Sequence, residues 1–246
     1  VRTVSVTAAK AGAKAVVLAD GSIAAGWIGG GCARGAVLKA AGEALRDGQP
    51  RLISIQPKDL LDVQQVKPGE MRDGVFYARN MCPSQGTMDV FVEPVLPRPH
   101  LAVLGASPVA VALVDIARRM GFFVSVCAPQ ADHPAFDIAD RLVDGFDLPA
   151  DGAQHGFIVI ATQGRGDGAA LKAVLGAQSR YTGFVGSRKK FAALRCDLEA
   201  DGLDVRSMDD MRSPAGLDLG SITPDEIAFS IVAEMIEIRR RGQRNT

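Results

Sequence analysis

The stretch LAVLGASPVAVALVDIARRMGFFVSV, residues 101–126, sets the architecture of the second half of this 246-residue chain. It begins and ends with apolar runs, and between them Val109, Leu113 and Ile116 recur with the 3.6-residue period of a helix. Gly121 can supply the left-handed residue that ends such a helix. Short apolar runs of this kind are typical of strands buried on both faces of a parallel sheet. The stretch therefore predicts a strand, a helix and a second strand parallel to the first.

The same alternation continues toward the carboxyl end of the chain. Residues 157–161 and 181–185 are further short apolar runs, which we interpret as strands of the same sheet. Residues 223–226 read Thr-Pro-Asp-Glu, a capping box with proline at the first helical position, and they predict the start of the last helix. We therefore expect a Rossmann-like domain of the α/β class with a mainly parallel sheet.

The first half of the chain has a different pattern. Residues 15–18 and 23–28 flank the tetrapeptide Ala-Asp-Gly-Ser and predict a hairpin. Residues 32–47 have a helical apolar stripe that Gly48 ends. Residues 88–93 alternate as a half-exposed strand does. We expect a smaller α/β domain here.

The boundary between the two halves is predicted from proline. Three prolines lie between residues 94 and 99, where they disfavour a helix and remove donors that a central strand needs. We therefore assign residues 1–97 to the N-terminal domain and residues 98–246 to the Rossmann-like domain.

Composition excludes several classes of protein. Twenty-eight basic residues balance twenty-eight acidic ones, so no overall field attracts nucleic acid or an anionic membrane. The longest apolar stretch, residues 101–117, is interrupted by Gly105, Pro108 and Asp115 and is too short to cross a bilayer. Four cysteines without the spacing of a zinc knuckle favour reduced thiols over a disulfide framework. We expect a cytoplasmic protein with no membrane span and no nucleic-acid partner.

Three consecutive glycines precede Cys32 at the predicted start of the first helix. Gly29, Gly30 and Gly31 would let the backbone lie close to a ligand and direct its N–H groups toward it. The positive end of the helix would also favour a Cys32 thiolate, which is a nucleophile and a ligand for soft metals. The alternative is that the glycines only allow close packing and that Cys32 is a small apolar cap.

Cys82 lies in a second turn of similar character. Residues 81–87, MCPSQGT, combine proline, serine and glycine, which suit a tight turn with exposed amides, and Ser84 is a candidate contact within it. If the two turns converge, Cys32 and Cys82 could together hold a soft metal or transfer sulfur. The alternative is a turn that only connects two elements.

The loop after the first strand of the second half has the position of a dinucleotide-binding loop. Residues 105–110, GASPVA, keep only Gly105 of the G-x-G-x-x-G fingerprint, and Cys127 and Ala128 replace the acidic residue expected after the next strand. NAD or NADP is therefore not an expected cofactor. A phosphate could still bind the helix N-terminus beside Gly105.

Two more loops follow predicted strands at the sheet edge where open α/β sheets bind ligands. The first, TQGRGD, offers Gly164 and Arg165 to an anion. The second, GSRKK, offers Ser187 and Arg188, and its cations oppose the dipole of the following helix unless a phosphate binds there. The alternative for the second loop is a solvated basic first turn.

Five segments, taken in order, resemble the XdhC/CoxI family of maturation factors for xanthine and carbon monoxide dehydrogenases. They are GWIGGGC at 26–32, MCPSQGTMDVFVEP at 81–94, ATQGRGD at 161–167, FVGSRKK at 184–190 and PAGLDLGSITPDEIA at 214–228. The stretch AKAGAKAVV at 9–17 is closer to the carbon monoxide dehydrogenase branch. Two loops depart from the family pattern, because GASP replaces the frequent Gly-Ala-Gly-His and SQG replaces a glycine pair after Cys82.

The resemblance implies a cytoplasmic, usually dimeric accessory protein that binds the molybdenum cofactor, as molybdopterin or its cytidine dinucleotide form. Such a protein protects the cofactor while a cysteine desulfurase or sulfurtransferase supplies its terminal sulfur, and then delivers it to a molybdenum hydroxylase apoenzyme. It implies a cofactor chaperone without turnover of its own. Cys32 and Cys82 lie on the family's cysteine-bearing glycine loops and are its candidate metal ligands.

Two other classes of function remain open from the sequence. An NAD(P)-dependent oxidoreductase would use the Rossmann-like half, and calorimetric titration with NAD and NADP distinguishes it. A protein-binding scaffold would contact a dehydrogenase or a sulfurtransferase without carrying a pterin. Fluorescence of oxidised pterin in the purified protein separates that scaffold from a cofactor chaperone.

Overall fold

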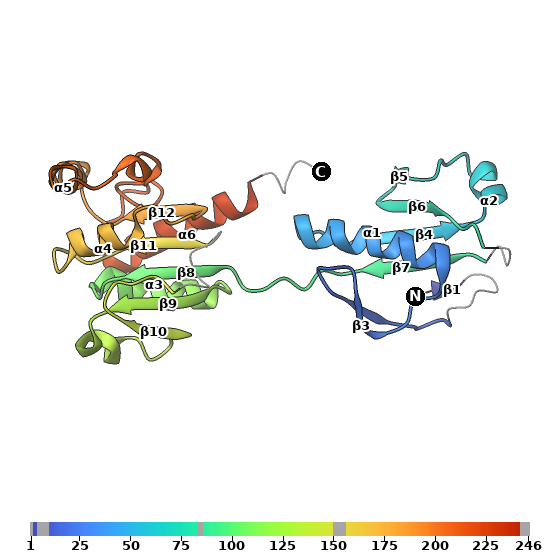
Figure 1. Cartoon of the computed structure of the whole chain (residues 1–246), viewed down its shortest axis with the longest axis horizontal. Helices are drawn as coiled ribbons and strands as arrows, with labels where there is room; N and C mark the ends of the chain where they lie inside the picture. Colours follow the sequence, from blue (N-terminus) through green and yellow to red (C-terminus); the bar gives the residue numbers. More distant parts are fainter. Residues whose placement is uncertain (1, 4–9, 83–85, 150–155, 242–246) are drawn as a thin grey trace. The chain divides into compact units, whose positions relative to one another are not determined.

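The computed structural model describes residues 2–3, 10–82, 86–149 and 156–241, and the chain divides into two compact units (Figure 1). The first unit is Val1–Pro97 and the second is Arg98–Thr246. Each unit has its own sheet and its own core.

The second unit is built on five parallel strands. Their order in the sheet is β10-β9-β8-β11-β12. The chain therefore forms β8, β9 and β10 toward one edge of the sheet and then returns to add β11 and β12 on the other side of β8. The strands are β8 (His100–Leu104), β9 (Phe123–Ala128), β10 (Arg141–Asp144), β11 (Phe157–Ile160) and β12 (Tyr181–Phe184). The α/β class and the parallel Rossmann-like sheet predicted from the sequence are confirmed. β10, a short strand at the sheet edge, was not predicted.

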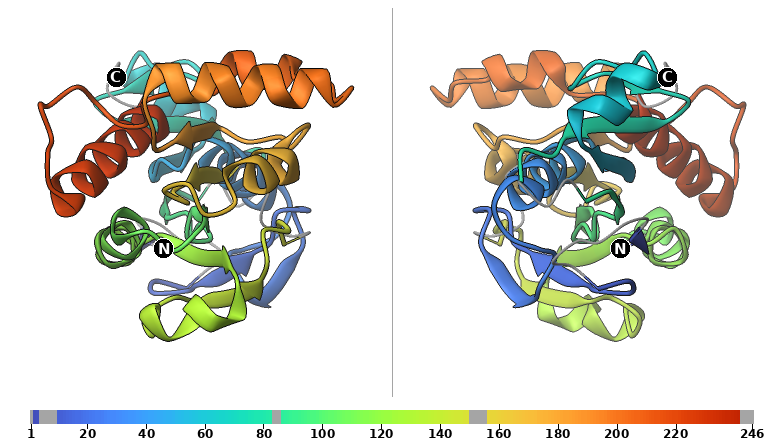
Figure 2. Two further views of the ribbon diagram at one scale, coloured as in Figure 1. Left: turned by 90° about the vertical axis from the view of Figure 1, so that its left-hand side faces the viewer. Right: turned by 90° about the vertical axis from the view of Figure 1, so that its right-hand side faces the viewer.

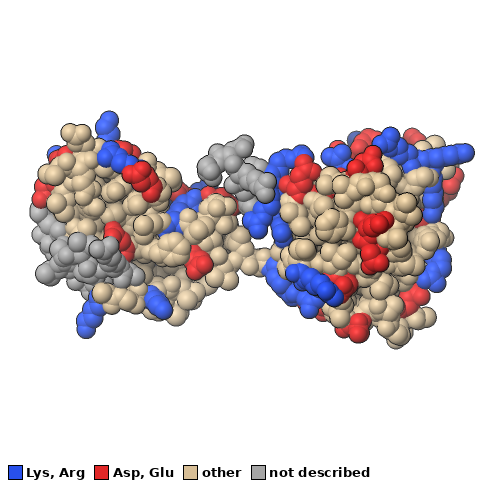
Figure 3. Space-filling model, turned by 180° about the vertical axis from the view of Figure 1, so that it is seen from behind, with Lys and Arg blue, Asp and Glu red and all other residues tan. Residues whose placement is uncertain are grey.

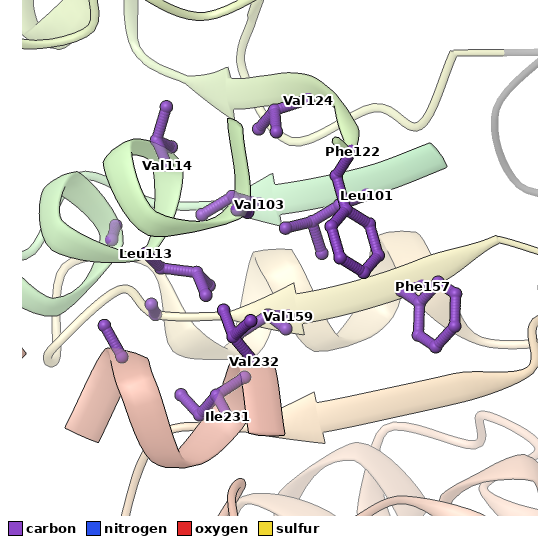
Figure 4. Packing of buried hydrophobic residues seen from close by; sticks show 14 of the residues in the cluster. Leu101, Val103, Leu113, Val114, Phe122, Val124, Phe157, Val159, Ile231 and Val232 are labelled. Atoms are coloured by element: carbon purple, nitrogen blue, oxygen red, sulfur yellow. The ribbon is translucent and has the colours of Figure 1, made fainter. Parts of the chain in front are cut away.

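Helices cover both faces of this sheet, as the view along the strands shows (Figure 2, left). They are α3 (Pro108–Arg119) and α6 (Pro224–Arg240) on one face and α4 (Asp167–Val174) and α5 (Arg188–Ala200) on the other. Alternate residues of β8 divide between the two layers, because Leu101 and Val103 pack with α3 and α6 while Ala102 and Leu104 pack with α4. Both faces are therefore buried, which explains the unbroken apolar runs in the sequence. Figure 4 shows the buried cluster on the face that α3 and α6 cover.

The helix ends follow the signals in the sequence. The Thr223 hydroxyl accepts from the Glu226 N–H, and the Glu226 carboxylate accepts in return from the Thr223 N–H, which completes the predicted capping box. Gly121, just past the end of α3, has the left-handed φ of 80° that was expected of it. Each such cap contributes about 1 kcal/mol.

The first unit combines a five-stranded mixed sheet with one long helix. The sheet order is β1-β7-β4-β6-β5, and a separate hairpin joins β2 to β3. The elements are β1 (Arg2–Thr3), β2 (Ala15–Val17), β3 (Ile23–Gly26), α1 (Gly31–Asp47), β4 (Arg51–Gln56), α2 (Lys58–Val63), β5 (Met71–Arg72), β6 (Val75–Arg79) and β7 (Met88–Val92). The predicted hairpin, helix and last strand are present. The sequence did not predict the pairing of β4 with β6 and β7.

α1 packs along one face of this sheet with its start beside the end of β4 (Figures 1 and 2). Ala33 and Val37 share a buried cluster with Ile53 and Ile55 of β4. The turn between the two elements is fixed by Arg51, whose Nη2 lies 2.5 Å from Asp47 Oδ2. Because α1 and β4 are each about 20–25 Å long, the first turn of α1 and the last residue of β4 lie at the same end of the unit.

No helix in the described part of the chain is long and apolar enough to cross a membrane. On the face shown in Figure 3, each unit carries basic and acidic side chains together, as the balanced net charge leads one to expect.

A charged cluster lies at the start of β10 in the second unit. Asp140 Oδ1 accepts from Arg98 Nη2 at 2.7 Å and from Arg118 Nη1 at 2.6 Å, and Oδ2 accepts from the Val124 N–H at 2.8 Å. The side chain of Asp140 is only 10% exposed. Burial acts to raise the pKa of Asp140, but the Val124 and Arg98 hydrogen bonds and the Arg118 charge outweigh it and lower the pKa.

Replacing Asp140 with asparagine should destabilise the second unit by about 1–3 kcal/mol at neutral pH, because two guanidinium groups lose their charged acceptor. Since the folded-state pKa of Asp140 is depressed, its contribution is complete above about pH 4 and disappears as the pH falls through the folded-state value. The measurement is pulsed alkylation of buried Cys127 against urea concentration. Asp115→Asn, which breaks an exposed pair with Arg119, is the control and should change stability by under about 0.5 kcal/mol.

Candidate functional site

The first candidate site is the cysteine-bearing end of the first unit. Cys32 is the second residue of α1, and its side chain lies outside the described part of the chain. Gly29 and Gly31 have φ values of 105° and 53°, a conformation that side chains disfavour. Gly30 caps the helix without a side chain to accept from the first-turn N–H groups, and that turn carries no acidic residue. The positive end of the helix is thus left to an external anion or thiolate.

The second cysteine lies in the connection between β6 and β7. Asn80 follows the last residue of β6 and donates its N–H to the Gln56 carbonyl at 2.7 Å, so the connection starts at the carboxyl end of β4. Cys82 is exposed, and its N–H donates to Asn80 Oδ1 at 2.9 Å. Ser84, predicted as a contact, lies outside the described residues.

The structure brings the two cysteine-bearing segments to one end of the first unit. The start of α1 lies at the carboxyl end of β4, because the end of α1 is tied to the beginning of β4 by Arg51. The Cys82 connection starts at this same end through the bond between Asn80 and Gln56. The sequence posed convergence of the two turns as a condition, and the described backbone places the start of α1 and the start of the Cys82 connection at the same end of β4.

A buried polar chain runs along β4 toward this end. The Gln56 amide donates to Ser54 Oγ at 2.9 Å, and Ser54 Oγ donates to Asp89 Oδ1 at 2.7 Å. Gln56 is only 7% exposed, and among the described residues its Oε1 atom has no hydrogen-bond partner. A buried acceptor without a donor costs about 1–3 kcal/mol, so the contacts among the described residues do not account for this atom.

Sequence reasoning missed both Gln56 and Asn80. The available signals were a polar residue at the end of the apolar run LISIQ and an asparagine two positions before a cysteine, which is the spacing of an Asx turn. Neither signal could be assigned to a site before the pairing of β4 with β6 was known, because that pairing brings Gln56 and Asn80 together.

The described side chains do not form a complete metal site. Among them, no three His, Cys, Asp or Glu residues cluster closely enough to hold an ion. Two thiols offer a soft but incomplete set, since a structural tetrahedral metal needs four ligands.

The predicted phosphate loop after β8 is occupied by the protein's own contacts. The Gly105 N–H donates to the Cys127 carbonyl at 2.9 Å. A Cβ atom at Gly105 would lie 2.7 Å from the Ala161 carbonyl oxygen and 2.7 Å from Thr162 Cα. Gly105 is thus required for close packing of two loops, and its N–H group is not available to a cofactor as the sequence had suggested.

The loop after β11 is closed by an internal carboxylate. Asp167 accepts from the Thr162 hydroxyl and from the Gly164 N–H at 3.1 Å, and its Oδ2 lies 2.5 Å from Lys190 Nζ. Burial acts to raise the pKa of Asp167, but the Lys190, Thr162 and Gly164 hydrogen bonds outweigh it and lower the pKa. Arg165 pairs with Asp132 at 3.3 Å. The groups that were expected to bind an anion already bind Asp167 and Asp132.

The loop after β12 adjoins a pocket. Ser187 accepts from the Lys190 N–H at 3.2 Å and caps α5, and Arg188 is exposed at the first position of that helix. The pocket has a volume of about 600 Å³ and is lined by 185–188, by 214–221, and by Ile227 and Ser230 of α6. Of the three predicted anion loops, this one remains open to a ligand.

The other two cysteines lie in the second unit and differ in their surroundings. Cys127 is fully buried in β9, where burial and the charge of Asp147 raise the pKa of its thiol to about 12. Cys196 is exposed on α5. Cys127 is therefore a packing residue, and Cys196 is a convenient reference for solvent-exposed thiol reactivity.

Comparison with known proteins places both units in one family. Residues 101–235 match the sequence model of the XdhC Rossmann domain, and residues 1–56 match that of the XdhC and CoxI family.

Two curated proteins are similar to this chain in sequence. The chain is 28% identical over 243 residues to the uncharacterized protein YqeB of Escherichia coli K12, covering 94% of this chain and 41% of that protein. It is 29% identical over 167 residues to a Bacillus subtilis 168 protein that is named as a probable xanthine dehydrogenase subunit, covering 63% of this chain and 47% of that protein. The chain thus spans less than half the length of these relatives.

A solved structure shares the fold. A crystal structure titled as a xanthine dehydrogenase from Bacillus halodurans aligns with 100% of this chain and 91% of its own, with a TM-score of 0.50 and 19% sequence identity. At this identity the likeness shows the fold alone.

The three described thiols should differ sharply in alkylation by iodoacetamide at pH 8. With a pKa of about 12, Cys127 has a thiolate fraction on the order of one in ten thousand, so it should stay unmodified while exposed Cys82 and Cys196 react. Peptide mass mapping over a time course measures each rate. Denaturation in urea must then release Cys127, and alkylation of Cys127 in the folded protein at the Cys196 rate would contradict the buried assignment.

Proposed function

This chain belongs to the XdhC and CoxI family, and on that premise we propose that it binds the molybdenum cofactor during maturation of a xanthine-dehydrogenase-type molybdenum hydroxylase. In this proposal the chain is a carrier that shields the cofactor while sulfur is installed and then assists its insertion. The observation that carries the proposal is the arrangement of Cys32 and Cys82 on two segments at one end of the first unit.

The donor set fits a metal that is already chelated. Cys32 and Cys82 supply soft sulfur, and the described side chains add no third ligand of the kind that a bare ion requires. The molybdenum cofactor supplies its own dithiolene ligands, so two protein thiols suffice to hold or shield it. A zinc or iron site would need more from the protein.

The remaining groups at this end suit the organic part of the ligand. The uncapped start of α1, with Gly29–Gly31 leading into it, directs backbone N–H groups outward and stabilises negative charge on a thiolate or on the ligand. Gln56 lies on the face of β4 opposite to α1, and in this proposal its Oε1 accepts from an N–H group of the pterin at the end of that strand. In this role the chain binds the ligand, orients it and excludes water from it. No side chain has to take part in a catalytic turnover.

The class of client comes from the family and from one named relative. The Bacillus subtilis protein carries the name of a probable xanthine dehydrogenase component, which supports a molybdenum hydroxylase apoenzyme as the receiving partner. The sulfur donor in the proposal is a cysteine desulfurase or sulfurtransferase. A carbon monoxide dehydrogenase is the alternative client of the same chemical type.

The oxidoreductase alternative is weakened by the closed loops of the second unit. In an NAD(P) enzyme, the loop after β8 would direct free N–H groups at the pyrophosphate, whereas here Gly105 donates to Cys127. At the neighbouring strand, Asp167 takes the donors of its own loop. We therefore expect no saturable binding of NAD or NADP by calorimetry.

Replacing Cys32 and Cys82 together with alanine should reduce copurified molybdenum at least tenfold when the protein is made in a host that synthesises the cofactor. The reason is the loss of both soft ligands. The measurements are molybdenum by elemental mass spectrometry and pterin by fluorescence of its oxidised form, each per mole of protein. Cys196→Ala is the matched control and should retain both.

The outcomes separate the remaining functions. Wild-type protein free of molybdenum and pterin would reject the carrier and leave a scaffold that binds only proteins. Undiminished molybdenum and pterin in the double variant would remove thiols from the binding site.

Replacing Gln56 with leucine should lower retained pterin without lowering stability by more than about 1 kcal/mol, because the lost bond to Ser54 is offset by removal of a buried acceptor without a donor. The measurements are pterin content and the urea midpoint of the apoprotein. Ser54→Ala is the matched control, since it breaks the same bond but leaves Gln56 Oε1 in place. Equal pterin loss in both variants would assign Gln56 a purely structural role.

A further inference from the structure

We infer that the pocket beside the carboxyl end of β12 is a ligand site of the second unit, for a small phosphate monoester with an apolar body. This β12 pocket is lined by residues 185–188 and 214–221, with Ile227 and Ser230 of α6. Its volume of about 600 Å³ is typical of small-molecule sites. The proposed carrier function uses none of these residues, so the inference goes beyond that function and does not depend on it.

The β12 pocket lies at the sheet edge where open α/β sheets bind ligands, because Val185 directly follows the last residue of β12. The loops after β8 and β11 reach the same edge, but the Gly105 N–H is taken by a backbone carbonyl and Asp167 accepts from the donors of its own loop. No carboxylate closes the β12 pocket in this way. Its acidic lining residue, Asp218, is exposed and pairs with no basic residue in the described part of the chain.

Hydrogen bonds hold the loop that forms one wall of the β12 pocket. The Gly216 N–H donates to Glu234 Oε2 at 2.8 Å, and the same oxygen accepts from the Tyr181 hydroxyl at 2.7 Å. The Leu217 N–H donates to the Ser230 carbonyl at 3.2 Å. Gly216 has a φ of 97°, and a Cβ atom there would lie 2.3 Å from Ser230 Oγ, so only glycine permits this approach. The wall is therefore formed before a ligand binds, which lowers the entropy cost of binding.

Apolar side chains make up much of the wall. Ala215 is buried and Val185 and Ile227 are half-buried, whereas Leu217 and Leu219 are 36% and 55% exposed. Leucine side chains that are left in water beside a pocket gain free energy when a ligand covers them. The wall thus favours a ligand with an apolar body.

Ser230 adds one buried polar atom to this wall. Its side chain is only 3% exposed, and its hydroxyl donates to the Ile227 carbonyl at 2.8 Å. Within the described ranges, no group donates to the Ser230 oxygen. This oxygen can still accept a hydrogen bond, so the apolar body can carry a hydroxyl or amino group.

The start of α5 supplies the donors of the β12 pocket. Ser187 caps the helix by accepting from the Lys190 N–H, and its own hydroxyl hydrogen is given to no described residue. The N–H groups of Arg188 and Lys189 likewise have no acceptor among the described residues, and the first turn contains no acidic side chain. With the exposed Arg188 guanidinium, these donors outnumber the two oxygens of a carboxylate and suit the three terminal oxygens of a phosphate monoester.

Phenyl phosphate is the probe, because it joins a phosphate monoester to an apolar ring. Titration of the full chain, followed by its amide NMR spectrum, should give saturable shifts at residues 186–189 and 227–230. The dissociation constant should be at least about tenfold below that of inorganic phosphate, because the ring covers exposed leucine. Phenol should give no saturable shift there, and benzoate should bind at least about fivefold more weakly than phenyl phosphate.

Two variants with matched controls test the two ends of the site separately. Arg188→Ala should weaken phenyl phosphate at least about fivefold, whereas Lys189→Ala, outside the pocket lining, should change it less than about twofold. Leu219→Ser should weaken phenyl phosphate but not inorganic phosphate. Its control is Ile222→Ser, which is 85% exposed on the same segment and does not line the pocket. All four side chains are exposed, so the urea midpoint should stay the same in each variant.

Each contrary result overturns a stated part of the inference. Absence of saturable shifts would overturn the β12 pocket as a ligand site, and equal weakening in Arg188→Ala and Lys189→Ala would overturn the assignment of the anion to the pocket. Benzoate that binds as tightly as phenyl phosphate would overturn the phosphate class. The double variant of Cys32→Ala and Cys82→Ala should bind phenyl phosphate as the wild type does, so a failure of the carrier function leaves this result unchanged.

Discussion

The packing of α1 against β4 is the constraint on which the first unit depends. Arg51 ties the beginning of β4 to Asp47 at the end of α1, and the shared cluster of Ala33, Val37, Ile53 and Ile55 keeps the two elements side by side. A helix that packs antiparallel on the strand that follows it must begin where that strand ends. The glycine turn before Cys32 is thereby brought to the edge from which the Cys82 segment starts, although fifty residues separate the two cysteines in the sequence.

In the second unit, the loops that follow two neighbouring strands of the Rossmann-like sheet pack against each other. The strand order that places β11 beside β8 brings Gly105 against Thr162, and their backbones lie too close for any larger residue at position 105. Next to them, Asp167 accepts from a hydroxyl, an N–H group and the Lys190 ammonium, which are the donors that a phosphate would use. A buried carboxylate therefore occupies donors that a bound anion would otherwise use.

The sequence predicted what depends on local periodicity and capping. The parallel strands, the α3 stripe, the capping box at Thr223 and the helix after Cys32 follow from residues close together in the chain. It did not predict β10, a four-residue edge strand whose residues alternate between half-buried and exposed positions, nor the pairing of β4 with β6. The partners of Gly164, Arg165 and Asn80 were also out of reach, because each bond joins loops whose meeting depends on the strand order.

The role of a glycine also depends on contacts between loops that the sequence does not predict. Gly105 and Gly29–Gly31 look alike in the sequence, as small residues between a strand and a helix, yet they differ in what surrounds them. A Cβ atom at Gly105 would collide with the neighbouring loop, whereas one at Gly30 or Gly31 would meet no atom of the described residues within 4 Å. A glycine enclosed by protein is explained by packing, but glycines facing open space at an uncapped helix start are not. Open space at the start of α1 is what a ligand would need there.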